Sequence, residues 1–412
     1  MMRHTLLWAV LLVILMQSTH AVADTWPRFR GPNGQGISDA KTIPSQWTDA
    51  DYTWKVSLPG TGLSSPVVWN DRVFVTCADA GAPMGTLLAI DANTGTVLWQ
   101  KDYALPSAKM NRLNSYATST PALTANRVYM LWCAGPQTTL IAVDHAGNMI
   151  FSKDFGSTVS SHGPAASPIV VNGAVVFTHE QRKDQVSHWI AVNGTTGDIL
   201  WKTERGQGQI SYSTPCVYSP SNSPAQLIFT SEMHGIAAVA SNSGTVLWEA
   251  KEALNMRVVS SPVLTEKLII ASCGSGGGGK LLTAVKAPVG NGKPSIAWTA
   301  TDRVTTPYVP TCLYKDGLLY SFHDQGTVAC RSAVTGEIFW QEKPAGKFYG
   351  SPVWVNGRIY CITREGQCVV LQADKQYKLL GVNDLGEASD ATPAVVDERM
   401  YLRTSSKLMC LD

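Results

Sequence analysis

The sequence predicts an all-β protein, an eight-bladed β-propeller of four-stranded antiparallel blades. Two observations predict this fold: a unit of about 47 residues recurs along the chain, and the last unit lacks a strand that the N-terminal region supplies. The composition agrees with it. The 412 residues include 35 Gly and 22 Pro, which are unfavourable in helices, and only 16% are charged, against about a quarter in an ordinary globular chain.

The first landmark of each unit is a small or hydroxyl residue followed by proline. The copies are Ser65-Pro66, Thr120-Pro121, Ser167-Pro168, Thr214-Pro215, Ser261-Pro262, Ser351-Pro352 and Thr392-Pro393, with Val309-Pro310 as a looser eighth. Apolar residues follow each proline, then a turn such as Asn172-Gly173 and a second apolar run. Because proline is tolerated at the first residue of a strand and Asn-Gly favours a tight turn, each unit is expected to start with a β-hairpin.

The second landmark is a turn that ends in a large aromatic residue. The fullest copy, Ala-Ile-Asp-Ala-Asn-Thr-Gly-Thr-Val-Leu-Trp, spans residues 89–99, and later copies end at Phe151, Trp201, Trp248, Trp298 and Trp340. Asp closes the turn, Gly takes the positive φ, and the aromatic residue begins an outer strand and fills the wedge between neighbouring blades. Ordinary hairpins in a sandwich are the alternative, but the regular period favours propeller blades.

The two ends of the chain complement each other. Residues 407–412 match the strand at residues 87–91 and stop before the Trp strand, whereas residues 52–56 contain such a strand, centred on Trp54. We therefore expect the N-terminal strand to complete the last blade and close the ring, which removes an exposed sheet edge. The expected division is a signal peptide at residues 1–23, an N-terminal arm at 24–50 and the propeller at 51–412.

The first residues have the pattern of a secretory signal. An apolar run from Leu6 to Met16 is followed by Ala21-Val22-Ala23, which predicts cleavage after Ala23 and a periplasmic or secreted protein. No later apolar stretch is long enough for a transmembrane segment. With 33 basic and 31 acidic residues and no block of like charge, the chain is not expected to bind nucleic acid.

The nine cysteines show no metal-binding or redox spacing. No two are adjacent and no CxxC occurs, so neither a zinc site nor a thioredoxin-type motif is expected. Because nine is an odd number, at least one cysteine is expected to be unpaired. Cys361 and Cys368 flank a hairpin turn, but in the simplest register they lie diagonally, which is unfavourable for a disulfide. Most of the cysteines are expected to be small buried hydrophobic residues.

The repeat Ala-x-Asp-x-x-Thr-Gly-x-x-x-Trp resembles that of pyrroloquinoline-quinone (PQQ)-type propellers. That superfamily includes the quinoprotein alcohol dehydrogenases and the BamB-like outer-membrane assembly factors. The segment Trp26-Pro27-Arg28-Phe29-Arg30-Gly31-Pro32-Asn33-Gly34 resembles the start of many exported PQQ-like repeat proteins. The resemblance covers about residues 24–412; it is specific for the fold and weak for function.

The enzymes of this superfamily are longer than this chain and typically place a disulfide between adjacent cysteines against the quinone. They also hold calcium through Glu, Asn and Asp beside a catalytic Asp. This sequence has no adjacent cysteine pair, and no motif identifies the carboxylate set. No cofactor is therefore assigned; PQQ with calcium belongs to the dehydrogenase alternative only.

Two other patterns resemble functional sites. Residues 274–280, Gly-Ser-Gly-Gly-Gly-Gly-Lys, have the spacing of a P-loop up to its lysine, but Leu281 replaces the Ser or Thr that binds magnesium, so a hairpin loop is expected. His179, His234 and His323 fall near the ends of equivalent strands in different blades, where they are too far apart to share a metal. No metal site is predicted.

The remaining candidates come from position. In a propeller, the segments before each innermost strand line one mouth of the central channel. In this chain those segments hold Asn114, Tyr116, His162, Tyr212, Arg257, Tyr308, Lys347, Tyr349 and Asp390. Such a set suits a polar planar ligand or a peptide segment, although it also suits the cap of a water-filled channel.

Three functions follow from these observations. The preferred one is an exported, non-catalytic binding or scaffold propeller whose partner is a protein, a glycan or a small molecule. The second is a PQQ-dependent alcohol or sugar dehydrogenase reduced to its propeller. The third is a BamB-like assembly factor that contacts cell-envelope proteins; the lack of a lipid-anchor cysteine at the predicted cleavage site argues mildly against it.

Overall fold

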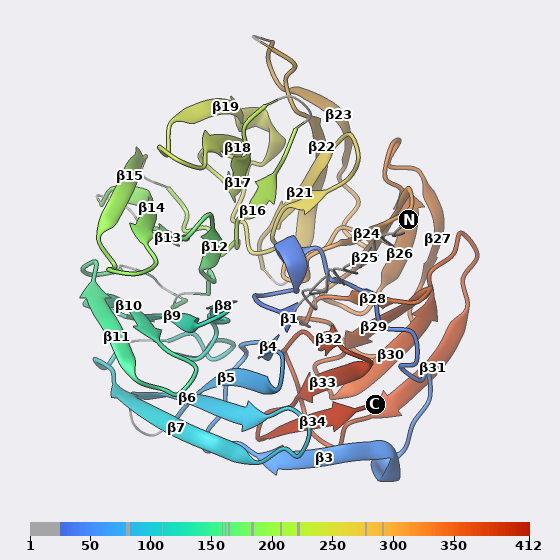
Figure 1. Cartoon of the computed structure of the whole chain (residues 1–412). Helices are drawn as coiled ribbons and strands as arrows, with labels where there is room; N and C mark the ends of the chain where they lie inside the picture. Colours follow the sequence, from blue (N-terminus) through green and yellow to red (C-terminus); the bar gives the residue numbers. More distant parts are fainter. Residues whose placement is uncertain are drawn as a thin grey trace, which may run out of the picture.

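The computed structural model describes residues 25–412 apart from 80–82, 109, 159, 161, 164, 183–184, 207, 221–222, 277 and 291. The predicted signal peptide and its cleavage site lie outside these residues. The described chain forms eight sheets arranged in a ring, each built on four antiparallel strands (Figure 1), which confirms the predicted eight-bladed propeller. Within it, no helix is long and apolar enough to cross a membrane. Its helices are three 3-10 turns, η1 (Pro32–Gly34), η2 (Asp49–Asp51) and η3 (Lys251–Ala253).

Each blade runs from an inner strand at the channel to an outer strand at the rim. Blade 1 comprises β4 (Val67–Trp69), β5 (Arg72–Ala78), β6 (Met84–Asp91) and β7 (Val97–Ala104). Blade 2 comprises β8 (Ala122–Thr124), β9 (Arg127–Ala134), β10 (Gln137–Val143) and β11 (Met149–Asp154). Blade 3 comprises β12 (Ile169–Val171), β13 (Ala174–His179), β14 (Ser187–Asn193) and β15 (Ile199–Arg205). Blade 4 comprises β16 (Cys216–Tyr218), β17 (Gln226–Ser231), β18 (Gly235–Ala240) and β19 (Val246–Ala250).

The second half of the ring repeats this order. Blade 5 comprises β20 (Val263–Leu264), β21 (Ile269–Gly274), β22 (Gly279–Lys286) and β23 (Ser295–Ala300). Blade 6 comprises β24 (Leu313–Lys315), β25 (Leu318–Phe322), β26 (Val328–Ser332) and β27 (Ile338–Glu342). Blade 7 comprises β28 (Val353–Val355), β29 (Arg358–Ile362), β30 (Gln367–Gln372) and β31 (Leu379–Asp384). Blade 8 comprises β32 (Ala394–Val396), β33 (Arg399–Arg403), β34 (Lys407–Leu411) and, from the other end of the chain, β3 (Tyr52–Ser57).

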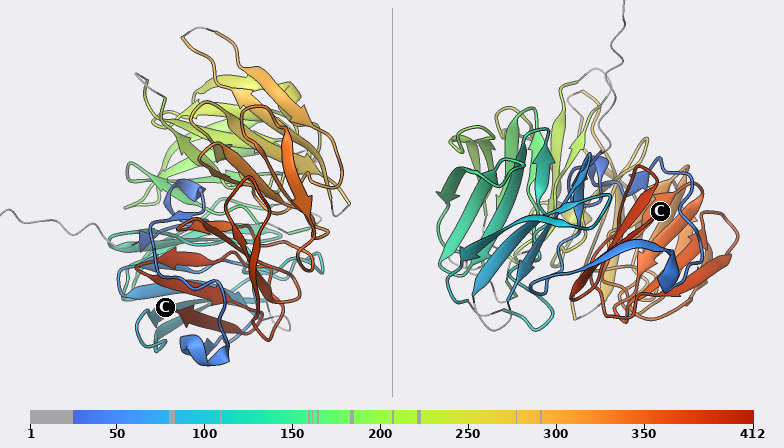
Figure 2. Two further views of the ribbon diagram at one scale, coloured as in Figure 1. Left: turned by 90° about the vertical axis from the view of Figure 1, so that its right-hand side faces the viewer. Right: turned by 60° about the horizontal axis from the view of Figure 1, so that its bottom comes forward.

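The pairing of β3 with β34 closes the ring as the sequence predicts, with Trp54 opposite Cys410. Two further strands of the N-terminal segment join other blades. β1 (Thr25–Trp26) pairs antiparallel with β4, and β2 (Ile37–Ser38) pairs in parallel with β28. From the ring centre the segment crosses blade 7 to the rim, where Gln46 binds the carbonyl of Leu380 before β3 begins (Figure 2).

A closed ring of hydrogen bonds joins the inner ends of all eight blades. The backbone N–H of Ser65 donates to Oγ1 of Thr120 at 2.9 Å, and each hydroxyl residue repeats this bond with its counterpart in the next blade. The donor and acceptor pairs are Thr120–Ser167 (2.9 Å), Ser167–Thr214 (3.1 Å), Thr214–Ser261 (3.1 Å), Ser261–Thr311 (2.9 Å), Thr311–Ser351 (3.0 Å), Ser351–Thr392 (2.9 Å) and Thr392–Ser65 (3.3 Å). We call these eight residues the hydroxyl ring.

The hydroxyl ring corrects the register of the loosest repeat. The sequence suggested Val309-Pro310 as its landmark, but Thr311 makes the ring hydrogen bonds and Cys312 occupies the place of the proline. Pro310 lies two residues before the position that the proline occupies in the other repeats, so it is not the repeat proline.

The outer edges are joined by the aromatic landmark. The indole N–H of Trp99 donates to the carbonyl of His145 at 3.0 Å, and the ring packs against Gly147 of the same turn in the next blade. Trp54, Trp201, Trp298 and Trp340 donate to the equivalent carbonyls of Ala92, Ser241, Ala333 and Asp374. These contacts confirm that the repeated aromatic residue fills the wedge between blades.

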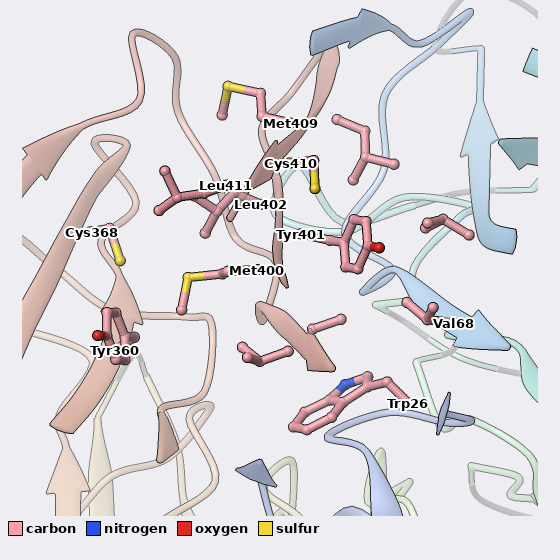
Figure 3. Close-up of a cluster of buried hydrophobic side chains, with 14 of the residues drawn as sticks. Trp26, Val68, Tyr360, Cys368, Met400, Tyr401, Leu402, Met409, Cys410 and Leu411 are labelled. Atoms are coloured by element: carbon pink, nitrogen blue, oxygen red, sulfur yellow. The ribbon is translucent and has the colours of Figure 1, made fainter. Parts of the chain in front are cut away.

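The N-terminal segment also contributes to the core where the ring closes. Trp26 is 1% exposed and belongs to one cluster with Val68 of blade 1 and Met400 and Tyr401 of blade 8 (Figure 3). Burial of these side chains joins the first and last repeats to the segment that crosses the centre.

Candidate functional site

The loops that precede the inner strands surround a cavity of about 310 Å³ on the ring axis. Seven of the nine sequence-predicted residues line it: Asn114, His162, Tyr212, Arg257, Tyr308, Tyr349 and Asp390. These loops leave an outer strand at the rim and return to the channel, so their last residues face the axis in every blade. The volume lies at the lower end of the range for small-molecule sites.

One end of the channel is closed by the N-terminal segment, whose Phe29 lines the cavity. Figure 1 shows this segment at the ring centre. Its hydrogen bonds reach several blades: the guanidinium of Arg28 donates to Pro215 O (2.6 Å), Asn33 exchanges two 2.8 Å bonds with Val217, and Leu123 N donates to Pro27 O (2.7 Å). The Arg28-Phe29-Arg30 segment therefore plugs the channel.

Arg257 is the cation on one wall. Its Nη1 lies 3.3 Å from the Tyr308 hydroxyl and 3.4 Å from His162 Nε2, and its Nη2 lies 3.3 Å from Gln209 Oε1. Burial, together with the charges of Arg257 and Arg182, lowers the pKa of His162, which therefore favours the neutral imidazole. Burial raises the pKa of Tyr308, so its phenol stays protonated.

Asp390 occupies another part of the wall and already has a partner. Its carboxylate accepts two hydrogen bonds from Arg364, at 2.8 and 3.1 Å, and the guanidinium stacks 4.0 Å from the ring centre of Tyr349. The bond to Asp390 raises the pKa of Arg364. This bidentate ion pair keeps the Arg364 guanidinium stacked on the ring of Tyr349, which lines the cavity.

The two other predicted residues lie outside the cavity lining. Tyr116 braces the loop between β7 and β8, because its hydroxyl accepts from Ala108 N (2.8 Å) and donates to Ala108 O (3.0 Å). The same loop sends Asn114 to the carbonyl of His162 (2.7 Å). Lys347 is exposed, and its backbone N–H donates to Glu365 (3.0 Å).

Sequence reasoning missed Phe29 and the hydroxyl ring. Seven ring members line the cavity: Thr120, Ser167, Thr214, Ser261, Thr311, Ser351 and Thr392. In the sequence these residues served only as a repeat landmark, although a hydroxyl residue in seven of the eight recognised copies was itself a usable sign of a shared role. The position of Phe29 depends on contacts more than 180 residues away, which no local pattern specifies.

The glycine-rich segment forms a β-hairpin loop between β21 and β22, as expected, and Gly276 reaches the rim of the cavity. In the described part of the chain, no three His, Cys, Asp or Glu side chains come together as a metal site. All nine cysteines are buried and unpaired.

These residues do not fit the calcium-bound quinone of the dehydrogenases. The calcium ion needs several carboxylate, amide or carbonyl oxygen ligands around it. The enzymes that the sequence resembles typically add a disulfide against the quinone ring. Among the described residues, the cavity lining has a single carboxylate, that of Asp390, which is paired with Arg364, and includes no cysteine.

Comparison with known proteins agrees with this architecture. The sequence matches the family described as outer membrane protein assembly factor BamB over residues 45–132, 83–307 and 295–412. The chain belongs to this family of PQQ-like-repeat propellers. A search of curated proteins by sequence gives no match.

Solved structures of PQQ-like propellers share the fold at low identity. A europium-containing methanol dehydrogenase aligns with a TM-score of 0.70 and 12% identity, over 93% of this chain and 90% of that one. BamB from Moraxella catarrhalis aligns with 0.60 and 13%, over 87% and 96%. A quinohemoprotein alcohol dehydrogenase from Comamonas testosteroni aligns with 0.67 and 14%, over 94% and 80%. At these identities the likeness describes the fold, which enzymes and assembly factors share.

Proposed function

We propose that this chain is an exported, non-catalytic β-propeller that binds a small ligand in its central cavity. The observation that carries the proposal is the closure of one channel end by Phe29, which leaves a lined cavity of about 310 Å³. The lining combines apolar side chains such as Val259 and Val309 with the polar groups of Arg257 and Asp390. Mostly apolar walls with a few oriented polar groups are typical of small-molecule sites.

Rigidity of the wall supports binding. The hydroxyl ring fixes the inner ends of the loops, and Arg364 holds Asp390 and Tyr349 in place. A preorganised site loses little conformational entropy when a ligand enters. The dehydrogenase alternative has less support, because the donor set of the cavity does not fit the calcium-bound quinone.

Ligand-observed NMR on the purified chain tests the proposal with four probes: benzoate, benzylamine, benzyl alcohol, and PQQ with calcium. At least one of the first three is expected to bind, and Val259→Trp, which fills the cavity, should abolish that binding. Val289→Trp is the matched control, since Val289 is 84% exposed on a loop of blade 5. Failure of all three single-ring probes at millimolar concentration, or undiminished binding to Val259→Trp, would overturn the proposal.

Two further outcomes assign a different function. Calcium-dependent PQQ binding accompanied by dye reduction with an alcohol would identify a dehydrogenase. Stable co-purification with an outer-membrane β-barrel assembly complex, unaffected by Val259→Trp, would identify an assembly factor whose binding surface lies outside the cavity.

A further inference from the structure

We infer that the cavity is built for a small organic anion, a carboxylate carried on an apolar or aromatic body. This inference rests on the proposed binding function and names the class of its ligand. It follows from the hydroxyl donors, the guanidinium and the carboxylates that the described residues place at the cavity.

The hydroxyl ring supplies the donors. Each ring hydroxyl accepts one backbone N–H, and a Ser or Thr hydroxyl has in addition one O–H to donate. Among the residues that the structure describes, none of the eight donates its O–H to a protein acceptor. Since seven of them line the cavity, their protons are available to whatever occupies it, water or ligand.

Arg257 adds a positive charge on the same wall. The contacts of its guanidinium with Tyr308, His162 and Gln209 are long, at 3.3–3.4 Å, and all three partners are neutral. Within the described chain, no carboxylate pairs with it. A half-buried guanidinium without an acidic partner is a recognition point for a carboxylate, which it can bind through two parallel hydrogen bonds.

The two described carboxylates nearest the cavity are already occupied. Asp390, the one acidic side chain among the described residues of the lining, accepts two short hydrogen bonds from Arg364. Asp324 lies behind Tyr308, is fully buried, and accepts the backbone N–H groups of Tyr308 (2.8 Å) and Val309 (3.1 Å). A cationic ligand would therefore meet hydroxyl donors and the positive charge of Arg257, which are unfavourable to it. An anion accepts hydrogen bonds from the hydroxyls and pairs with the guanidinium.

The rest of the lining requires an apolar body on the ligand. Phe29 covers the closed end, and Leu63, Leu113, Val259 and Val309 contribute aliphatic surface. Desolvation of an aromatic ring against these side chains would add affinity to the charge-assisted bonds.

Three probes with the same ring and different charge separate the classes: benzoate, benzyl alcohol and benzylamine, titrated at one ionic strength by calorimetry. Benzoate is expected to bind at least tenfold more tightly than the other two. Arg257→Gln should weaken benzoate binding about tenfold or more, because it removes the charge-assisted bonds. The same substitution should leave the affinity for benzyl alcohol nearly unchanged.

The ring itself is tested by a matched pair. Ser351→Ala removes a hydroxyl that lines the cavity, and Ser65→Ala removes one that does not, although each loses one equivalent ring hydrogen bond. Benzoate affinity should fall several-fold in Ser351→Ala and stay unchanged in Ser65→Ala. An equal fall in both variants would show that the hydroxyls act only in packing and would overturn their role as donors.

The failures of the two proposals are distinguishable. If benzyl alcohol or benzylamine binds as tightly as benzoate in the cavity, the site binds ligands but the anion class is wrong. If none of the three binds, the proposed function fails and the anion class with it.

Discussion

The backbone N–H of Thr392 donates to Oγ of Ser65 at 3.3 Å, which joins the last repeat to the first across 327 residues of sequence. This bond completes the hydroxyl ring, and β3 completes blade 8 at the rim. The propeller is therefore closed twice, by side chains at the axis and by a strand at the edge. Both closures bring residues distant in sequence together, so each stabilises the ring only once the whole chain has folded.

Ser65→Ala is expected to lower stability by about 1–2 kcal/mol, because it leaves the buried N–H of Thr392 without its acceptor. The midpoint of urea unfolding measures the effect. Ser65→Thr retains the hydroxyl and is the control. Equal midpoints for the Ala variant and the unmodified protein would show that the ring bond contributes nothing to closure.

Tyr129 replaces a missing tryptophan. Blade 2 has Phe151 at the aromatic landmark, which has no N–H, and the carbonyl of Gly194 in blade 3 instead accepts the Tyr129 hydroxyl at 2.9 Å. Tyr129→Phe should cost about 1 kcal/mol in the free energy of unfolding, since it leaves this buried carbonyl unpaired. The double variant Tyr129→Phe with Phe151→Trp should recover most of that loss by restoring the indole donor used in other blades. Absence of recovery would contradict the equivalence of the two donors.

The repeat made the fold and much of the site predictable from sequence. A hydroxyl before proline, a Gly turn and an aromatic residue recur because each blade needs the same inner anchor, turn and wedge. The ends of the loops between these landmarks were expected at the channel mouth, and His162, Arg257 and Asp390 do line the cavity there; their role in binding stays a prediction.

Details below the level of the repeat were not predictable. Lys347 and Tyr349 share one loop and are separated only by the buried Phe348, yet Lys347 is exposed and Tyr349 lines the cavity. Phe29 enters the site through long-range contacts of Arg28 and Asn33 with blade 4. Such packing depends on the assembled ring and leaves no periodic trace.

Glu180 is expected to make stability depend on pH. It is 8% exposed, and its carboxylate accepts the indole N–H of Trp189 (3.3 Å), over which the guanidinium of Arg205 stacks at 4.1 Å. Burial raises the pKa of Glu180 from 4.5 to about 7, against the opposing effects of Trp189, the backbone of Ser211 and Arg205. The folded state therefore favours the protonated acid. This contribution to stability is fully present below about pH 4.5 and is lost as the pH rises towards 7.

Glu180→Gln keeps an acceptor for Trp189 and removes the titration. Relative to the unmodified protein, the free energy of unfolding of this variant should increase between pH 4.5 and 7 and stay constant above that range. Urea unfolding at pH 5, 6, 7 and 8 measures the difference. A difference that does not change with pH would show that Glu180 does not titrate in this window.

The glycine run in blade 5 permits close packing between neighbouring blades. A Cβ on Gly279 would lie 1.9 Å from the carbonyl oxygen of Thr306, whereas one on Gly278 would meet nothing closer than His323 Nε2 at 3.6 Å. Gly279→Ala is therefore expected to destabilise the protein by about 2 kcal/mol or more, and Gly278→Ala by no more than about 0.5 kcal/mol. Urea unfolding of both variants measures this contrast. If the loop were a phosphate cradle, both substitutions would weaken the binding of inorganic phosphate and would change stability by similar amounts. The packing role predicts instead that neither the unmodified protein nor either variant binds inorganic phosphate detectably at this loop.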